Sequence, residues 1–204
     1  MKDHPSQAAA AEDINLRIAR RVREIRSARG ETMESLAARS GVSKSMISLI
    51  ERGEASPTAV VLEKLAGGLG VAMATLFGPE KSAPLQPLSR RSDQSIWKDP
   101  ESGYLRRNLS PPGWPTPIQL VEVHFPAGSR VAYESDNRKP ALEQQIWVLQ
   151  GQIELTWGGQ HFLLKVGGCL ATRLDRPLVF SNPSTQAARY LVAISDQAAV
   201  QLLQ

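Results

Sequence analysis

The chain has 204 residues with 42% hydrophobic content, a formal net charge of +4 and a pI of about 9.5. This length holds one large domain or two small ones with a buried core, and the mild positive charge permits an anionic partner. The single cysteine, Cys169, excludes an internal disulfide, and no apolar run approaches the roughly 20 residues of a membrane span. These features indicate a soluble, cytoplasmic protein without a membrane partner.

Residues 1–13 are small and polar, without periodicity and without the apolar stretch of a secretory signal, so a flexible tail is expected there. A first helix is predicted from residue 14, because apolar side chains recur at helical spacing until Gly30 ends the pattern. The residues that share its apolar face are Ile14, Ile18, Val22 and Ile25.

Four shorter helices are predicted in the segments TMESLAARSG, VSKSMISLIERG, TAVVLEKLAGGLG and AMATLFG. Thr32 and Ser43 are suited to cap the second and third helices, because their hydroxyls accept hydrogen bonds from free amides. The short turn at Ser40 and Gly41 is typical of a helix-turn-helix. The side chains expected in the core of this half are Leu36, Ala37, Val42, Met46, Ile47, Ile50, Leu62, Leu65 and Leu69.

Residues 14–78 resemble the lambda-repressor/Cro-like, or Xre-type, helix-turn-helix family through LAARSGVSKSMISLIERGEASPT, LEKLAGGLGV and LFG, in that order. The resemblance implies a five-helix domain whose third helix enters the major groove of double-stranded DNA. The family pattern places DNA contacts at Thr32, Met33, Ser43, Lys44, Ser45, Ser48, Leu49 and Arg52. Among these, Lys44, Ser45 and Leu49 are expected at base edges. Thr32, Ser48 and Arg52 are expected at phosphates, and Met33 stands where the family often has glutamine.

Six arginines between Arg17 and Arg29 are expected either to touch the DNA backbone or to form a solvated face of the first helix. Residues 1–80 carry 11 basic and 10 acidic side chains. DNA binding must therefore come from local clustering of charge on one face rather than from the overall charge.

Residues 79–95 are rich in proline and polar side chains, which predicts a linker. From residue 96 the sequence pattern is typical of β-strands. The segments IQLVEVHF, QIWVL, QIELTW and RYLVAI are separated by the turn sequences PPG, PAG, GG and NPS. Residues from about 96 to 195 resemble a small cupin through FPAGSRV, EQQIWVLQGQIELTWGGQHFLLKVGG and DRPLVFSNPSTQAARYLVAI, and a cupin-like sensor or dimerisation domain is expected over residues 96–204. The predicted fold class is therefore multidomain α plus β, with a double-stranded β-helix, or jelly-roll, barrel after the helices.

Cupin metal sites use histidines and a glutamate, and the resemblance places these ligand positions on poor donors. The glutamate position falls on Gln144, and the second-motif histidine falls on Leu178. Arg138, Lys139 and Pro140 occupy the region of the histidine pair. No metal or other cofactor is expected. A displaced site from Glu122, His124, Glu143 and His161 is a weaker alternative, and Cys169 is expected to be a small buried group.

Strand alternation places one set of side chains on a single face, which the cupin resemblance implies is the cavity side, and a pocket for a small organic acid or an amino-acid-like effector is expected there. Its predicted apolar and amide lining consists of Gln144, Ile146, Val148, Leu178 and Phe180. Arg138, Arg130 or Arg173 are expected to hold the carboxylate of the ligand. A filled barrel that serves only in dimerisation remains open, with Trp97, Trp114, Trp147 and Trp157 as candidates for packing or for a dimer seam.

These features together predict a transcriptional regulator, most simply a repressor, that binds an inverted-repeat operator as a homodimer or a tetramer. In this hypothesis the metal-free barrel senses a small molecule, supplies the dimer contact, or does both. The alternative is a cupin metalloenzyme resembling the iron-dependent epoxidases, which have the same order of helices and barrel. The sequence favours the regulator and a protein that is not an enzyme, because the ligand positions lack histidine and glutamate.

Overall fold

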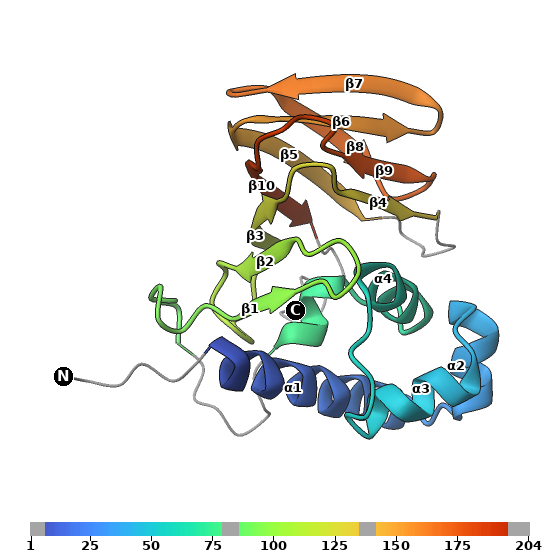
Figure 1. The fold of residues 1–204 in the computed structure, drawn as a ribbon. Helices are drawn as coiled ribbons and strands as arrows, with labels where there is room; N and C mark the ends of the chain where they lie inside the picture. The colour runs from blue at the N-terminus through green and yellow to red at the C-terminus, as the bar shows by residue number, and fades with distance from the viewer. Residues whose placement is uncertain (1–6, 79–85, 135–141, 196–204) are drawn as a thin grey trace.

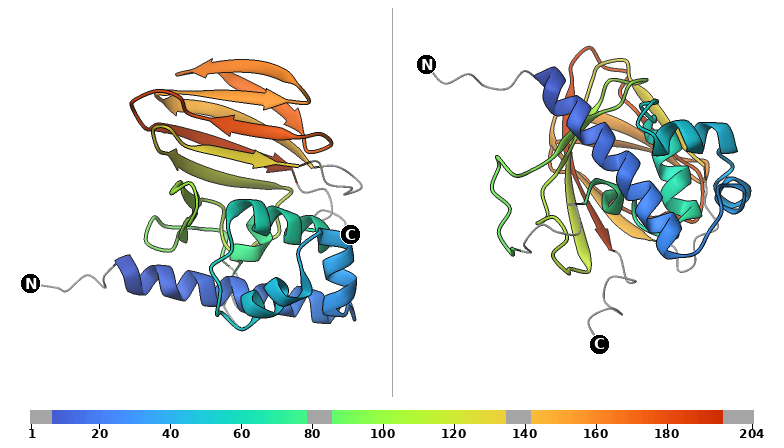
Figure 2. Two further views of the ribbon diagram at one scale, coloured as in Figure 1. Left: turned by 45° about the vertical axis from the view of Figure 1, so that its right-hand side comes forward. Right: turned by 90° about the horizontal axis from the view of Figure 1, so that it is seen from below.

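The computed structural model describes residues 7–78, 86–134 and 142–195, with backbone alone for residues 7–13. The helices gather at one end of a β domain made of two antiparallel sheets (Figure 1). The left view of Figure 2 shows the same arrangement, with the helices at one end and β7 (Gln160–Lys165) at the other. Among the described residues, no helix is long and apolar enough to cross a membrane.

Four α-helices and one short 3-10 helix make up the N-terminal half. Their bounds are α1 Gln7–Ala28, α2 Met33–Ser40, α3 Lys44–Glu51, α4 Ala59–Gly68 and η1 Met73–Phe77. The expected fifth α-helix is therefore wrong, because its five residues are too few for more than a 3-10 turn and Ala72 offers no side-chain cap. The expected tail is also too long. The helix begins at Gln7 because the sequence QAAAAED is rich in alanine, the best helix former.

The expected caps are present at both helices of the helix-turn-helix. Thr32 Oγ1 accepts from the Ser35 amide at 3.1 Å, and Ser43 Oγ accepts from the Met46 amide at 3.2 Å. Gly41 ends α2 with a φ of 68°, a left-handed conformation that favours glycine. The turn therefore reverses the chain within a few residues and fixes the angle at which α3 leaves α2.

Within the described residues, ten strands form two antiparallel sheets that pack face to face. The six-stranded sheet has the order β1 (Ile96–Lys98), β2 (Leu105–Asn108), β3 (Ile118–Phe125), β10 (Ala188–Ser195), β5 (Glu143–Gln150) and β8 (Cys169–Arg173). The four-stranded sheet has the order β4 (Arg130–Tyr133), β9 (Leu178–Ser181), β6 (Gln152–Trp157) and β7. This arrangement fits the predicted cupin-like fold. Of the predicted linker, residues 79–85 lie outside the described residues, and residues 86–95 contain turns.

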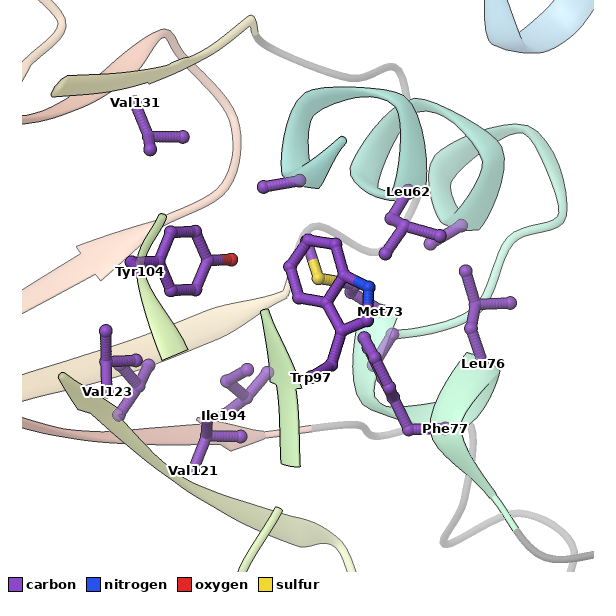
Figure 3. Packing of buried hydrophobic residues seen from close by; sticks show 14 of the residues in the cluster. Leu62, Met73, Leu76, Phe77, Trp97, Tyr104, Val121, Val123, Val131 and Ile194 are labelled. Carbon is purple, nitrogen blue, oxygen red and sulfur yellow. The ribbon is translucent and has the colours of Figure 1, made fainter. Parts of the chain in front are cut away.

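The helical half and the β half share one continuous hydrophobic core. Trp97 on β1 is 1% exposed and packs edge-on against Phe77 of η1 and Tyr104 of the β half, with ring centroids 5.8 Å apart in each pair (Figure 3). Asp99, also buried, accepts a hydrogen bond from the Ala59 amide at the start of α4. A side chain of the β half therefore helps to cap a helix of the helical half.

The four tryptophans do not form one seam. Trp97 lies in the core between the halves, whereas Trp114 and Trp147 are 37% and 47% exposed at different places. Trp157 is half-buried beneath the guanidinium of Arg176, 4.5 Å from its ring. The tryptophans are therefore scattered over the molecule, and Trp147 is the exposed tryptophan on the outer face of the six-stranded sheet.

Candidate DNA interface and interior cavity

The outward face of α3 carries most of the residues that the helix-turn-helix pattern predicts for DNA. Lys44, Ser45 and Arg52 are exposed, and Ser48 and Leu49 are half-buried. Their spacing places them on one side of the helix, because Ile47, Ile50 and Glu51 occupy the buried side. The helix therefore presents a strip of donors, hydroxyls and one aliphatic side chain.

The remaining predicted contacts lie beside this strip. Thr32 and Ser43 are exposed at the amino ends of α2 and α3, where each acts as a cap. Met33 is half-buried and packs against the core, so only part of its side chain faces outward. Met46, which was expected in the core, is instead 38% exposed. Helical spacing explains the correction, since Met46 lies one residue before buried Ile47 and turns away from it.

Both cations of the strip are paired with carboxylates. Lys44 forms an ion pair with Glu34, and Arg52 forms one with Glu54 at 2.7 Å. The hydrogen bond from Lys44 lowers the pKa of Glu34, and that from Arg52 lowers the pKa of Glu54. All four side chains are more than half exposed, so water and salt screen these pairs and a phosphate can replace the carboxylate.

A buried ion pair fixes α3 against α1. The Arg26 guanidinium donates to both carboxylate oxygens of Glu51, with distances of 2.6 and 2.7 Å, and also to the Glu31 carbonyl at 2.8 Å. The hydrogen bond to Glu51 raises the pKa of Arg26. Arg21 donates to the Thr75 carbonyl and to Glu24. Two of the six arginines between Arg17 and Arg29 are therefore structural, a role that the sequence did not suggest.

A close approach between α4 and α2 completes the support of α3. A Cβ at Gly68 would come within 2.8 Å of the Ser40 Cβ and 3.0 Å of Leu36 Cδ1. Gly68 is therefore the residue that lets these helices meet. Arg39 on α2 also donates to the Gly68 carbonyl, so α4 is joined to α2 by packing and by a hydrogen bond.

A cavity of about 70 Å³ lies inside the β half and extends to helices α4 and η1. Its wall includes Arg106 and Arg176, two carboxylates at Glu63 and Glu134, and Gln144. It also includes all three tyrosines of the chain, Tyr104, Tyr133 and Tyr190. The apolar part of the wall consists of Met73, Val123, Phe125, Val131, Leu142, Leu174, Leu178, Phe180, Val192 and Ile194.

Burial dominates the chemistry of the three tyrosines. It raises the pKa of Tyr104 and raises the pKa of Tyr133 and Tyr190 well above the usual value. The hydroxyls of Tyr104 and Tyr133 lie 3.3 Å apart, which allows a hydrogen bond between them. These side chains are therefore neutral at neutral pH and offer hydroxyl groups, not charge, to the cavity.

Three of the predicted pocket residues line this cavity, namely Gln144, Leu178 and Phe180. Ile146 and Val148 are buried on the same inward face of β5 but lie away from the cavity wall. Arg173 points outward, pairs with Glu143 at 2.9 Å and lines a shallower groove instead, because it alternates with buried Thr172 on β8. Arg130 is exposed on β4, and Arg138 lies outside the described residues.

Arg106 is the functional candidate that sequence reasoning missed. It is 6% exposed and alternates with exposed Leu105 on β2, so its side chain faces the interior. Its register partner Val123 belongs to the cavity wall. A charged residue in a short strand such as LRRN gives little warning of this inward position, because two adjacent arginines leave the register ambiguous.

The alternative metal ligands are occupied or separated. Glu122 lies on the outer face near His124 and pairs with Arg107 and Arg189 at 3.4 and 3.2 Å. His161 Nδ1 lies 3.0 Å from the Thr156 hydroxyl on the other sheet. No group of three or more His, Cys, Asp or Glu that could share a metal occurs among the described residues. Cys169 is exposed, contrary to expectation, because alternation on β8 turns Thr172 inward and Cys169 outward.

Comparisons with known proteins place this architecture among bacterial regulators. The Helix-turn-helix family HTH_3 matches residues 22–76. The HTH-type transcriptional regulator PuuR of Escherichia coli is 30% identical over 186 residues, which cover 89% of this chain and 96% of that protein. SutR of Escherichia coli, also named an HTH-type transcriptional regulator, is 27% identical over 172 residues, covering 83% of this chain and 89% of SutR.

A solved structure extends the likeness to the fold of nearly the whole chain. The HTH_3 family transcriptional regulator from Vibrio cholerae superposes with a TM-score of 0.74 and 22% identity, over 91% of this chain and 98% of that one. The order of helices and β domain is therefore shared with that protein.

Proposed function

We propose, from the premise that this chain belongs to the Xre-type helix-turn-helix transcriptional regulators with a C-terminal cupin domain, that it binds a specific DNA sequence through α3. The observation that carries this proposal is the exposed strip of α3, which holds Lys44, Ser45, Ser48, Leu49 and Arg52 together. Lysine donates to guanine acceptors, a serine hydroxyl serves either base type, and leucine contacts a thymine methyl. A DNA-bound regulator of this kind acts in the cytoplasm.

The operator in this proposal is an inverted repeat read by a homodimer. One helix-turn-helix reads few base pairs, whereas two place their recognition helices about 34 Å apart in successive major grooves. The outer face of the six-stranded sheet offers a surface for the second copy. Leu120, Leu191, Ala193 and Trp147 are neighbours there by strand register, and Leu120 and Trp147 are 40% and 47% exposed. Exposed apolar patches of this kind are typical of protein interfaces.

The barrel acts in this proposal as a metal-free sensor domain. The donor set supports that role, because Gln144 and Leu178 occupy the positions that carry a glutamate and a histidine in metal-binding cupins. A neutral amide is a weak ligand, and an aliphatic side chain is none. One equivalent of iron, manganese, nickel or zinc in protein purified without chelators would overturn this part of the proposal.

The DNA proposal is tested by selecting bound sequences from a random duplex pool with the full chain and measuring affinity for the selected site. The double variant Lys44→Ala/Ser45→Ala should lose specific affinity while its affinity for random DNA changes little. Lys165→Ala is the matched control, because that lysine is exposed on β7 at the far end of the molecule. Failure to enrich any sequence would refute the proposal, and an equal loss on random DNA would reduce the two residues to phosphate contacts.

The dimer proposal is tested by light scattering coupled to size exclusion. Trp147→Glu should shift the protein from dimer to monomer, since it places a charge in the centre of the proposed contact. Leu163→Glu is the matched control, because Leu163 is 52% exposed on the other sheet. A wild-type monomer at concentrations that saturate the operator would contradict the proposal.

A further inference from the structure

Arg106 is a buried charge that the fold leaves without a hydrogen-bond acceptor on one edge. Its Nε and Nη2 atoms are buried and have no hydrogen-bond partner among the described residues. A guanidinium removed from water without an acceptor is unfavourable. The ring of Phe77, whose centroid lies 5.4 Å from the guanidinium carbon, compensates for part of this loss through a cation–π contact.

The unpaired edge has the geometry of a carboxylate receptor. The Nε and Nη2 hydrogens of a guanidinium point the same way and together match the two oxygens of a carboxylate. Arg106 lines the cavity, and no side chain of the described residues bonds to its Nε or Nη2 atom, so a ligand carboxylate would compete with no existing partner there. The surrounding wall excludes most water, which strengthens the contact.

The rest of the cavity limits the ligand in size and charge. A volume of about 70 Å³ limits the ligand to a small molecule. Val123, Val192 and Ile194 give the wall an apolar character that suits a short carbon chain. The carboxylate of Glu63 lines the same cavity and disfavours a second negative charge on the ligand, whereas Glu134 at the cavity edge is 75% exposed and pairs with Lys64 at 2.9 Å.

We propose that the cavity is an effector site for a short-chain monocarboxylate, whose carboxylate binds Arg106 and whose carbon chain lies against the apolar wall. The site assigns the anchoring role to Arg106, in place of Arg138, Arg130 or Arg173. Gln144 and Arg176 line both this cavity and the outer groove, so they mark the side on which the two hollows adjoin.

The effector site is made by both halves of the chain, which gives it a direct connection to α3. Glu63 of α4 and Met73 of η1 belong to the cavity wall, and Phe77 of η1 holds the anchoring guanidinium. α4 in turn packs on α2 where Gly68 meets Ser40. A ligand bound to Arg106 therefore contacts the helices that support the DNA-reading helix. This last step rests on the proposed function, since an effect on DNA needs a protein that binds DNA.

Binding to the full chain is tested first without DNA. Propionate, lactate and butyrate are each compared with the corresponding neutral amide at matched ionic strength, by thermal unfolding and by calorimetric titration. We expect the carboxylates to raise the melting temperature and the amides to leave it unchanged. Equal effects of a carboxylate and its amide, or no effect of any of the three carboxylates, would overturn the proposal. Stabilisation by inorganic phosphate alone would overturn the carboxylate class.

Two variants locate the site. Arg106→Met should weaken carboxylate binding tenfold or more, whereas Arg189→Gln, on the outward face of β10, should leave it unchanged. Arg106→Lys keeps the charge and loses the paired Nε and Nη2 donors, so it should also weaken carboxylate binding. This variant replaces Arg106→Met in the test if the methionine variant does not fold. Wild-type affinity in a folded Arg106 variant would overturn the assignment.

The effect on DNA separates this inference from the proposed function. If the full chain binds its selected operator and propionate or its homologues change that affinity in wild type but not in a folded Arg106 variant, the coupling is supported. A carboxylate that binds without changing operator affinity would overturn the coupling, but the proposal of a carboxylate site would stand. Loss of all sequence-specific DNA binding, with carboxylate binding intact, would count against the proposed function instead.

Discussion

The ion pair between Arg26 and Glu51 is expected to be a principal support of α3, the helix proposed to read DNA. Glu51→Ala removes two of the three hydrogen bonds of the Arg26 guanidinium and leaves a charge in a site where the Arg26 side chain is 13% exposed. Breaking a buried pair in this way costs about 3–5 kcal/mol. Because the guanidinium keeps its bond to the Glu31 carbonyl and some contact with water, we expect a loss near the lower limit, about 3 kcal/mol.

The loss is measured by urea titration followed by far-ultraviolet circular dichroism. In thermal unfolding followed by the same signal, the melting temperature should fall by about 6–12 °C if the two halves unfold together through their shared core. Glu143→Ala is the control, because its pair with Arg173 has both side chains more than half exposed and should contribute less than about 1 kcal/mol. The double variant Arg26→Met/Glu51→Leu should recover much of the loss, since no charge is then left buried. A loss below about 1 kcal/mol in Glu51→Ala would refute the reasoning.

Three further predictions concern the junction, the cavity and the DNA surface. Asp99→Ala should destabilise the chain by about 1–3 kcal/mol in urea titrations, because a buried amide at the start of α4 loses its acceptor; an unchanged midpoint would contradict the capping role. Because burial raises the pKa of Tyr133 and Tyr190, the folded state retains their protons longer than the unfolded state. The free energy of unfolding should therefore keep this contribution below about pH 10 and fall above it. The fall should be less steep in the double variant Tyr133→Phe/Tyr190→Phe. Glu54→Gln should free Arg52 and tighten binding to random DNA a few-fold at low salt, an effect that rising salt removes in equilibrium titrations.

The order of elements could be predicted from local patterns. The segments IQLVEVHF and QIELTW correspond to β3 and β6, and the caps at Thr32 and Ser43 begin α2 and α3. Such features depend on residues close together in the chain, such as alternation along a strand or a hydroxyl three residues before an amide. The errors occurred at ends of elements, as in the early start of α1 and in the 3-10 form of η1.

The inner wall of the barrel was less predictable, because it depends on which strands face each other. Alternation placed Gln144, Leu178 and Phe180 inward, but it gave no means to choose between Arg106 and Arg107 on a strand of four residues. Arg173 was taken for a pocket residue although it stands on the outer face. The joint between the halves, where Asp99 meets α4, connects segments 40 residues apart and had no local signal.

Trp97 has a consequence for observing the molecule in solution. It is fully enclosed at the junction of the helical and β halves, whereas Trp114, Trp147 and Trp157 retain partial contact with solvent. Its indole emission should therefore lie at the blue edge of the protein's fluorescence spectrum and shift to the red when the halves part. The chain thus contains an intrinsic optical reporter of the angle between its halves, which can follow their movement in real time without an attached dye.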